Sequence, residues 1–360
     1  MAISQLMAHT GGAAIFRSRL FRQLFGTPLN LLLTLGTAWS LWALTSFLFR
    51  WAVLTATWEG TGETCKQNGG ACWIYVRVKA QQMFFGVYPA EELWRPALVM
   101  VLFLALLTLS MFKRFWRPWL LGVWIASVPT LYLLMAGGVL GLASVPTARW
   151  SGLPLTFLLA IFGLAIAFPF AVLLALARKS SMPVIRLLAT MYIEFIRGVP
   201  LISLLFMASV LLPLFLPAGV TPDKLLRAQV AIVMFAAAYI AEVIRGGLQA
   251  VGAGQYEAAK ALGLGYWRMM GLVVLPQALS TSIPPLMNIF ISFFKDTTLV
   301  VIVGLLDFLW AVRSPYSDPE WGSFATESYV VAGATYFVLC FTMSKYSRYL
   351  ERTIRQKRQH

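Results

Sequence analysis

The stretch Glu257–Pro276, EAAKALGLGYWRMMGLVVLP, lies between two strongly apolar runs, and the interpretation of the whole chain depends on it. It begins with good helix formers, is interrupted by Gly263 and Gly265, and then becomes apolar again. Glycine tolerates the left-handed backbone that commonly ends a helix, so we predict a short helix over 255–262 followed by a sharp turn. A short, rather polar helix in so apolar a chain is expected to lie outside the lipid.

The composition indicates a membrane protein. The chain has 360 residues, of which 59% are hydrophobic and only 12% are charged, and its mean hydropathy is +0.75. Soluble domains carry about 25% charged residues. No segment alternates with the period of a barrel strand, so helices are the expected way to satisfy the backbone in lipid. The sequence therefore predicts an all-α polytopic protein with about eight transmembrane helices. These lie near 29–49, 96–112, 119–138, 153–177, 199–217, 226–245, 271–293 and 328–348.

The segment 297–312 is apolar but short, and it contains Asp307. It suits a ninth span, a re-entrant segment or an interfacial helix. A ninth span would move the six basic residues of the C-terminal tail to the other side of the membrane, so we reject that alternative.

The distribution of charge predicts the orientation. With eight spans, one face receives both tails and the segments 113–117, 178–197 and 245–268, which together hold 19 of the 29 Lys and Arg residues. Against them stand four acids, when Glu242 near the end of span 226–245 is counted with this face. The other face holds ten of each sign, so the whole net charge of +15 lies on the first face. The positive-inside rule makes that face cytoplasmic, with both termini. We interpret the basic residues as topology signals and contacts with anionic membrane lipid, and we expect no nucleic-acid partner.

Cys65 and Cys72 lie in the largest non-cytoplasmic loop, at about 50–95. Six residues separate them, which is enough to close a small ring, so a disulfide is expected in an oxidising periplasm. The alternative is two unrelated thiols. The basic segment 1–26 is expected to be an uncleaved membrane segment, because no small-x-small cleavage site follows it.

The sequence contains no constellation for catalysis. It has no phosphate-binding loop, no metal-spaced Cys/His cluster and no nucleophile motif. Its two histidines, His9 and His360, lie in the tails. We expect no catalytic residue, no metal and no cofactor on this chain.

The spans change in character near residue 153. The earlier ones are rich in leucine and tryptophan, whereas the later ones contain prolines, small residues and polar groups. In the later part, AAAYIAEVIRGG (236–247) predicts a helix that approaches a neighbour closely. Span 271–293 has three prolines and several polar side chains, which favours a broken helix along a translocation path. The alternative is that its hydroxyls bond back to their own helix and that Lys295 and Asp296 form an interfacial ion pair.

The opening stretch resembles the EAA signature of ABC-importer permease subunits. The matching positions are Glu257, Ala258, Ala259, Gly263, Leu275 and Pro276, with Val273 in place of the usual Ile. The surrounding runs YIEFIRGVPLISLLF, AAAYIAEVIRGGLQAVGAGQYEAAKALG and LPQALSTSIPPLMNIFISFFKDTTLVVIVGLLDF are similar to the histidine/glutamine, or polar amino-acid, family. Together they cover about 153–350. The length, the extra N-terminal spans and the cysteine-bearing loop further resemble the M-type permeases of general L-amino-acid transporters.

The resemblance implies the domain organisation and the partners. Residues 151–350 would form a five-helix type I ABC-importer permease core, residues 1–150 an N-terminal extension with three spans and the loop, and residues 351–360 a basic cytoplasmic tail. The partners would be a homologous second permease, two ATPase subunits that bind ATP and Mg, a periplasmic amino-acid-binding protein and the amino acid. The chain would act in the bacterial inner membrane.

The resemblance also implies two sets of site residues. The EAA region would be a coupling helix that docks on the ATPase through Tyr256, Glu257, Ala258, Ala259, Lys260 and Gly263, with Tyr266 and Trp267 as further contacts. The substrate path would involve Gln277, Ser280, Asn288, Lys295, Asp296, Thr297 and Thr298. The family more often has Ser at the position of Thr298. No acid replaces the apolar Phe290, which favours neutral or acidic substrates over arginine or lysine alone.

Two other classes of function are weighed against this one. An ATP-independent channel or secondary transporter would account for the spans and the polar helix, but not for the EAA pattern. A membrane enzyme would require a catalytic cluster, which the sequence lacks.

Overall fold

The computed structural model describes residues 21, 23–139, 141–217 and 219–359, except for the side chains of 113 and 354–359. Both histidines lie outside the described residues, as does most of the basic N-terminal segment. The chain forms two compact units, Met1–Arg77 and Val78–His360. Each is described by itself.

The longest element in the described residues of the first unit is one helix. Helix α2 (Pro28–Phe49) is extended by a π-helical turn, η1 (Arg50–Leu54), and begins at Pro28. Its N-cap, Thr27, accepts a hydrogen bond of 3.1 Å from the Asn30 amide. No side chain of α2 is buried, and the hydroxyl groups of Thr37, Ser40 and Thr45 donate to carbonyls one turn back. An apolar helix that satisfies its own polar groups on every side suits contact with lipid.

A compact loop follows α2. It contains the short helix α3 (Gly62–Asn68) and the beginning of α4 (Trp73–Phe85). Cys65 and Cys72 form a disulfide across a Cα–Cα distance of 5.4 Å, and both are buried. The Trp73 indole donates to the Ala52 carbonyl at 2.7 Å, which ties the loop to the end of the preceding helical segment.

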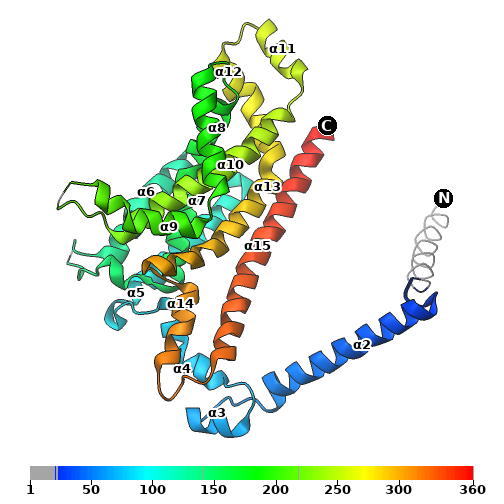
Figure 1. Cartoon of the computed structure of the whole chain (residues 1–360), viewed down its shortest axis with the longest axis vertical. Helices are drawn as coiled ribbons and strands as arrows, with labels where there is room; N and C mark the ends of the chain where they lie inside the picture. Colours follow the sequence, from blue (N-terminus) through cyan, green and yellow to red (C-terminus); the bar gives the residue numbers. More distant parts are fainter. Residues whose placement is uncertain (1–20, 22, 140, 218, 360) are drawn as a thin grey trace. The chain divides into compact units, whose positions relative to one another are not determined.

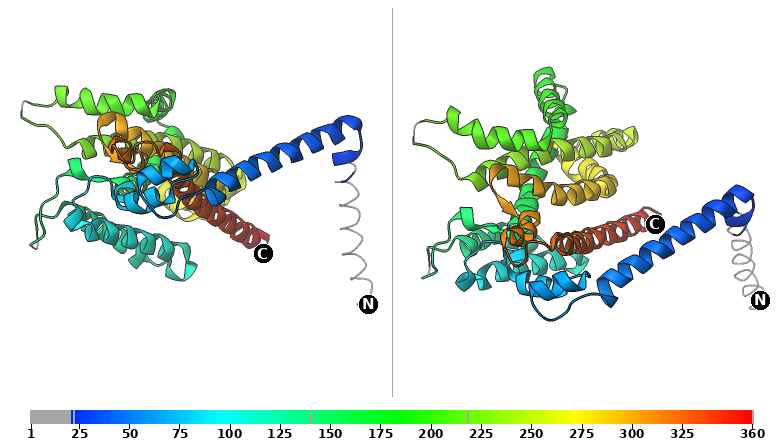
Figure 2. Two further views of the ribbon diagram at one scale, coloured as in Figure 1. Left: turned by 90° about the horizontal axis from the view of Figure 1, so that it is seen from below. Right: turned by 60° about the horizontal axis from the view of Figure 1, so that its bottom comes forward.

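The second unit is built around α7 (Gly152–Arg178) and α10 (Lys224–Gln249), which pack against each other (Figures 1 and 2). Helix α13 (Leu275–Asp296) packs on α10, and α15 (Ala325–Gln359) runs along α13. On the other side, α5 (Trp94–Met111) contacts α7, and α6 (Pro118–Ala136) contacts α5. The second and third predicted spans therefore belong to the same unit as the core helices.

Small residues bring the central helices together. A Cβ added to Gly163 of α7 would lie 2.6 Å from Ile232 of α10, and one added to Gly247 would lie 2.5 Å from the Ala278 carbonyl of α13. Ala237 and its neighbouring alanines on α10 are buried. Without a hydrophobic driving force in lipid, such close backbone contact stabilises helix association. The predicted close approach of 236–247 is confirmed.

Six helical segments of the described chain are long and apolar enough to cross a membrane, and a bent pair, α8 with α9, would make seven. The six are Pro28–Leu54, Ala90–Met111, Pro118–Ala136, Gly152–Arg178, Lys224–Gln249 and Tyr266–Val303. Each overlaps a predicted span. The predicted span 328–348 lies inside the continuous helix α15, which is not one of the six.

The prediction of a single span over 199–217 is wrong. Helix α9 (Leu201–Val210) has only ten residues and gives way to a 3₁₀ turn that contains Pro213. The preceding segment, predicted as a cytoplasmic loop, forms α8 (Pro183–Gly198), which meets α9 at 102°. Pro200 causes the break, because a proline disfavours the α conformation in the residue before it and cannot donate the helical hydrogen bond.

The prolines do not break the seventh predicted span. Helix α13 continues through Pro284 and Pro285, and a π-helical turn, η6 (Met270–Val274), precedes it. Beyond α13 the chain forms the 3₁₀ helix η7 (Thr297–Val303), turns at Gly304 and enters β1 (Leu306–Asp307), which bridges to Ser151 and Gly152. The short α14 (Phe308–Arg313) follows. The segment 297–312 therefore does not form a ninth span.

The cap that Asp307 forms at the start of α14 can be tested through its pH dependence. Its buried carboxylate caps α14 by accepting hydrogen bonds from Leu309 and Trp310, and burial raises its pKa from 3.8 to about 6. Between those values the folded chain holds a proton that the unfolded chain lacks, so the group's contribution to stability is full below about pH 4 and is lost as the pH rises through 6. Two pH units correspond to about 3 kcal/mol.

We expect Asp307→Asn, which keeps one of the two capping oxygens, to raise the free energy of unfolding of the purified protein at pH 7 by up to that amount. The advantage should shrink as the pH falls below 6. Asp307→Ala also removes the titrating group, so its difference from the wild type should show the same pH dependence, but at a lower stability at every pH because the cap is lost. A stability difference between the Asp307→Asn variant and the wild type that does not depend on pH would contradict the raised pKa. Unfolding curves from pH 5 to 8 measure it.

Candidate functional site

The EAA stretch forms a short exposed helix, α11 (Ala253–Ala261), at one end of the second unit (Figure 1). The helix ends as a Schellman motif. The Gly263 amide donates to the Lys260 carbonyl at 2.9 Å, and the Leu264 amide donates to the Ala259 carbonyl at 3.1 Å. Gly263 has φ of 70°, which favours glycine, and no atom lies within 4 Å of a Cβ added there. The predicted helix and turn are confirmed to within two residues.

Helix α11 has an inner and an outer face. Ala259 is buried, whereas Glu257, Ala258 and Lys260 are exposed. Glu257 and Lys260 form no ion pair with each other or with any other described residue. The outer face therefore presents free charges beside a small alanine, which is a surface suited to a protein partner.

Two hydrophobic side chains, one on each side of the turn, extend the outer surface. Leu262 is 80% exposed and Trp267 is 71% exposed. Tyr266 is exposed to a smaller degree and lies edge-on to Trp267. Aromatic side chains that are free in this way are typical interface residues.

Tyr256 is one of the predicted contacts with the ATPase. In the structure its hydroxyl faces the helix bundle. Its hydroxyl donates to the Leu248 carbonyl at 3.2 Å. The Lys179 ammonium, at the end of α7, donates to the same carbonyl at 3.0 Å and to the Tyr256 hydroxyl at 3.2 Å. Tyr256 therefore fastens α11 to the ends of α7 and α10.

A second contact connects α11 to α13. The Gln277 side chain donates to the Gln255 side-chain oxygen at 3.0 Å and to the Val273 carbonyl at 2.9 Å. The sequence predicts Gln277 on the substrate path, whereas the structure places it at the α11 end of α13.

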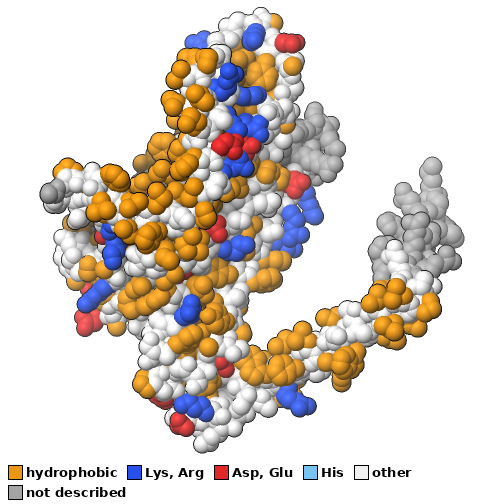
Figure 3. Space-filling model, viewed as in Figure 1, with side chains coloured by type: hydrophobic (Ala, Val, Ile, Leu, Met, Phe, Trp, Pro, Cys, Tyr) orange, Lys and Arg blue, Asp and Glu red, His pale blue; other side chains and the backbone are white. Residues whose placement is uncertain are grey.

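An ion network that the sequence analysis missed lies beside α11. Three arginines and two glutamates from α7, α8 and α10 take part: Arg178, Glu194, Arg197, Glu242 and Arg245. Glu242 accepts from Arg178 at 2.9 Å and from both nitrogens of one edge of Arg245. Figure 3 shows charged side chains of both signs over this end of the unit, while hydrophobic side chains dominate the middle.

A signal for the network is present in the sequence. The pentapeptides EFIRG (194–198) and EVIRG (242–246) share one pattern, in which Glu and Arg lie three residues apart on one helix face. Taken singly, each indicates no more than cytoplasmic charge. The pairing of the two copies through Arg178 depends on the packing of α8 against α10, which the sequence does not reveal.

We expect Glu242→Gln to destabilise the purified protein by about 1.5–3 kcal/mol, because it leaves three partly buried guanidinium groups around a single carboxylate. Unfolding midpoints in detergent measure the loss. Glu63→Gln is the control, since the Glu63–Lys66 pair is exposed and such pairs contribute little. Equal midpoints for the two variants would show that the network does not stabilise the bundle.

The predicted substrate-path residues do not form one compact site. Gln277 and Lys295 are 18 residues apart on α13, which corresponds to about 27 Å along the axis. At about 100° per residue, Gln277, Asn288 and Lys295 nevertheless lie within about 20° of each other around the helix, and Asn288 and Lys295 are at least partly exposed. They form a polar stripe along one face. Ser280 lies about 60° from it.

The part of the predicted substrate path at the end of α13, Lys295–Thr298, could offer a cation and an anion to a zwitterionic amino acid, but it is only partly assembled. Lys295 and Asp296 are adjacent in sequence, so they point about 100° apart, and no ion pair joins them. The buried Thr297 hydroxyl donates to the Phe294 carbonyl at 2.8 Å, as the back-bonding alternative expects, and Thr298 is half-buried. Lys295 remains the exposed cation on the polar stripe.

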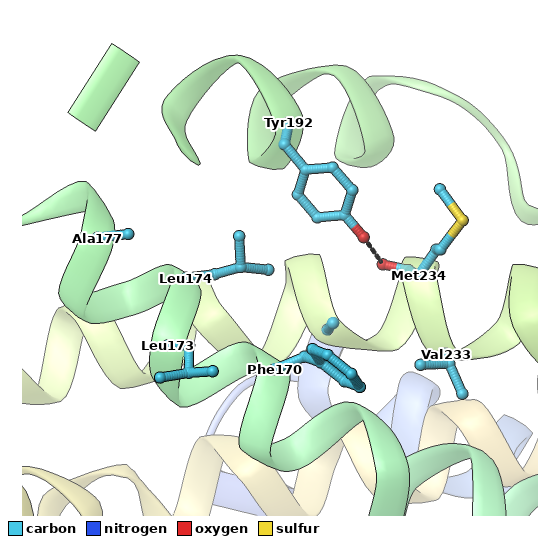
Figure 4. Close-up of a pocket in the computed structure, with 8 residues that line it drawn as sticks. Phe170, Leu173, Leu174, Ala177, Tyr192, Val233 and Met234 are labelled. Carbon is cyan, nitrogen blue, oxygen red and sulfur yellow. Dashed lines mark hydrogen bonds between the residues drawn. The ribbon is translucent and has the colours of Figure 1, made fainter. Parts of the chain in front are cut away.

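An apolar cavity of about 420 Å³ opens between α7, α8 and α10 (Figure 4). Its one visible polar contact is the hydrogen bond of 2.9 Å from the Tyr192 hydroxyl to the Met234 carbonyl. It is lined by Phe170, Leu173, Leu174, Ala177, Tyr192, Val233, Met234 and Ala237. A lining without charge does not suit a zwitterion. In the described residues, no group of three or more His, Cys, Asp or Glu is arranged to hold a metal ion.

The comparisons with known proteins agree with this architecture. Residues 167–356 match the family "Binding-protein-dependent transport system inner membrane component". The chain is 45% identical to the inner membrane amino-acid ABC transporter permease protein YhdY of Escherichia coli over 92% of this chain and 91% of that protein. It is 36% identical to the glutamate/glutamine/aspartate/asparagine transport system permease protein BztC of Rhodobacter capsulatus, over 94% and 93%.

A solved structure is also similar. A crystal structure of an amino acid ABC transporter with histidines is 34% identical, with a TM-score of 0.50, and the match covers 56% of this chain and 92% of that chain. The glutamate/aspartate import permease protein GltK of Escherichia coli is matched over the same share of this chain and 91% of its own length. The family match over 167–356 and the two relatives that match along more than 90% of their length give one result. The chain belongs to the inner membrane components of binding-protein-dependent transport systems.

Proposed function

We propose that this chain is the membrane-spanning permease subunit of an ATP-driven importer that moves L-amino acids into the cytoplasm. The observation that carries the proposal is the exposed helix α11, which ends in a glycine-dependent turn and is bonded to the ends of three bundle helices. The full-length relatives with amino-acid transport in their names support the substrate class. As an inner membrane component of this family, the chain itself is not catalytic.

The proposal includes partners that supply energy and substrate. The outer face of α11, with Glu257, Ala258, Lys260 and the exposed Trp267, would dock on one of two ATPase subunits, which would bind ATP and Mg. A homologous second permease would complete the translocation path, and a periplasmic binding protein would deliver the amino acid.

The proposed orientation places α11 and both termini in the cytoplasm of a bacterium whose inner membrane the chain spans. The excess of basic residues on that side supports this orientation. The loop that holds the disulfide then faces the periplasm, where disulfides persist.

Residues 151–350 are proposed as the transport core, 1–150 as an added region with three spans and 351–360 as a basic tail. The shorter relative, of which 91% is matched by 56% of this chain, supports a core of that size.

The contacts of α11 suggest how movement would pass into the membrane. Tyr256 and Lys179 connect it to α7 and α10, and Gln255 connects it to α13, the helix with the polar stripe. A displacement of α11 by ATP-driven closure of the ATPases would therefore move the helix that lines the path. An ATP-independent channel or secondary transporter would have no use for this exposed helix.

We expect Gly263→Asp to abolish uptake in proteoliposomes that contain the full complex, without preventing membrane insertion. The substitution meets no atom, but it strains a backbone held at a φ of 70° and adds charge beside the docking face. Gly254→Ala is the control, because that glycine lies within α11, has open space around it and needs no left-handed backbone. Uptake by the Gly263 variant at the wild-type rate would refute the coupling role.

The Lys295→Ala and Asp296→Ala double variant tests the ligand role of the stretch Lys295–Thr298. We expect a rise of about tenfold or more in the substrate concentration for half-maximal uptake, because a charge-assisted contact is lost. Asn288→Ala distinguishes a general effect of the polar stripe from one of the charged pair. Unchanged uptake by the double variant would end the assignment of these residues.

A further inference from the structure

A second cavity, of about 330 Å³, lies at the opposite end of α10 from α11. It forms where the end of α9, the first turn of α10 and the end of η7 meet. Its lining contains two cations and no acid. The lining residues are Phe206, Ser209, Val210, Lys224, Arg227, Ile302, Val303 and Gly304.

The cavity holds polar groups whose bonding is incomplete. Arg227 donates to the Ser209 backbone carbonyl, but its Nε and the Ser209 hydroxyl are buried without a partner. In the described part of the chain four buried side-chain polar atoms lack a partner, and two of them are these. Buried polar atoms are nearly always hydrogen-bonded, so two unsatisfied donors in one cavity indicate a missing acceptor.

The second cation is also free. Lys224 is exposed and makes no ion pair in the described structure, and the neighbouring Asp223 is engaged elsewhere. The Asp223 carboxylate caps the Leu225 amide at 2.8 Å and accepts from the Thr147 hydroxyl at 2.6 Å. A Cβ added to Gly304 would lie 3.6 Å from the Lys224 ammonium, so the glycine leaves room for that ammonium over the turn.

These donors suit an oxyanion. Guanidinium, ammonium and hydroxyl groups together provide several hydrogen-bond donors, and arginine matches the two oxygens of a carboxylate. The walls on either side, Phe206, Val210, Ile302 and Val303, are apolar. The volume is at the lower end of the range for small-molecule sites.

The cavity lies at the far end of η7 from the predicted substrate-path residues Lys295–Thr298. Helix η7 joins Lys295–Thr298 at one end to Val303 and Gly304 at the other, a separation of about 14 Å at the 3₁₀ rise of about 2 Å per residue. On the proposed orientation the cavity opens on the periplasmic side, before the polar stripe of α13.

We propose that this cavity binds the carboxylate of an incoming amino acid, and that it favours anionic over cationic substrates because two positive charges face it. This inference rests on the proposed function and names its substrate class. An acidic amino acid, with a net charge of −1, gains most from the two cations, a zwitterion gains less, and lysine or arginine is repelled.

The test is equilibrium binding of L-glutamate, L-glutamine and L-lysine to the purified complex in phosphatidylcholine nanodiscs, without ATP or binding protein. We expect L-glutamate to bind most tightly and L-lysine most weakly. Lys224→Gln should weaken L-glutamate binding about tenfold or more, and Lys224→Arg should retain it. Ser209→Ala should cause a smaller loss. Arg149→Gln, which removes an exposed cation on the segment next to α10, should leave the affinity unchanged.

Three outcomes would overturn the inference. They are no saturable L-glutamate binding by the wild type, equal affinities in wild type and Lys224→Gln, and a signal that occurs only with phosphatidylglycerol, which would identify an anionic lipid as the ligand. Uptake by the full wild-type complex is measured in parallel. If it transports amino acids while the affinities are equal, only this inference fails. If it transports none, the proposed function fails.

Discussion

The arrangement of the bundle depends on how five charged side chains are paired at its α11 end. Arg178, Glu194, Arg197, Glu242 and Arg245 come from three helices, and all but the exposed Glu194 are partly withdrawn from water. Charges at such a site must be paired, because an unpaired one costs several times the energy that an exposed ion pair supplies. The pairing therefore fixes the ends of α7, α8 and α10 relative to one another. Lys179 and Tyr256 then place α11 against the same ends.

Close packing extends this rigid end along the bundle. The contacts of Gly163 with Ile232 and of Gly247 with Ala278 leave no space for a methyl group, so α7, α10 and α13 can slide or tilt only as a set. The hydrogen bond between Gln255 and Gln277 connects α11 to α13 directly. A force on α11 is therefore divided between the ends of α7 and α10, which Tyr256 contacts, and α13. Most side chains of α11 remain exposed, which keeps the helix available to a partner but means that it buries little apolar surface of its own.

The sequence predicted best what depends on local chemistry. Helix α11 and its turn followed from helix formers and Gly263, and the close approach of α10 followed from its alanines and glycines. The prediction of a span over 199–217 was wrong. Apolar composition alone does not reveal that α8 and α9 meet at 102° on either side of Pro200. The prediction that span 271–293 is a broken helix was also wrong, since α13 continues through Pro284 and Pro285 and packs against neighbouring helices there. The ion network could not be derived from either E-x-x-R copy, because its geometry arises only when α8 meets α10.

The two ends of α10 differ in a way that suits directional transport. At the α11 end the three arginines have two glutamates, so their charge is mostly neutralised within the chain. At the other end Lys224 and Arg227 face a cavity with no acid in its lining. The exposed Lys224 costs the fold little, but two buried donors without an acceptor, Arg227 Nε and the Ser209 hydroxyl, are costly for a fold whose only task is stability. The cost is explained if an anion occupies the cavity during part of the cycle, and the uncovered stripe of Gln277, Asn288 and Lys295 then offers that anion a polar surface leading toward α11.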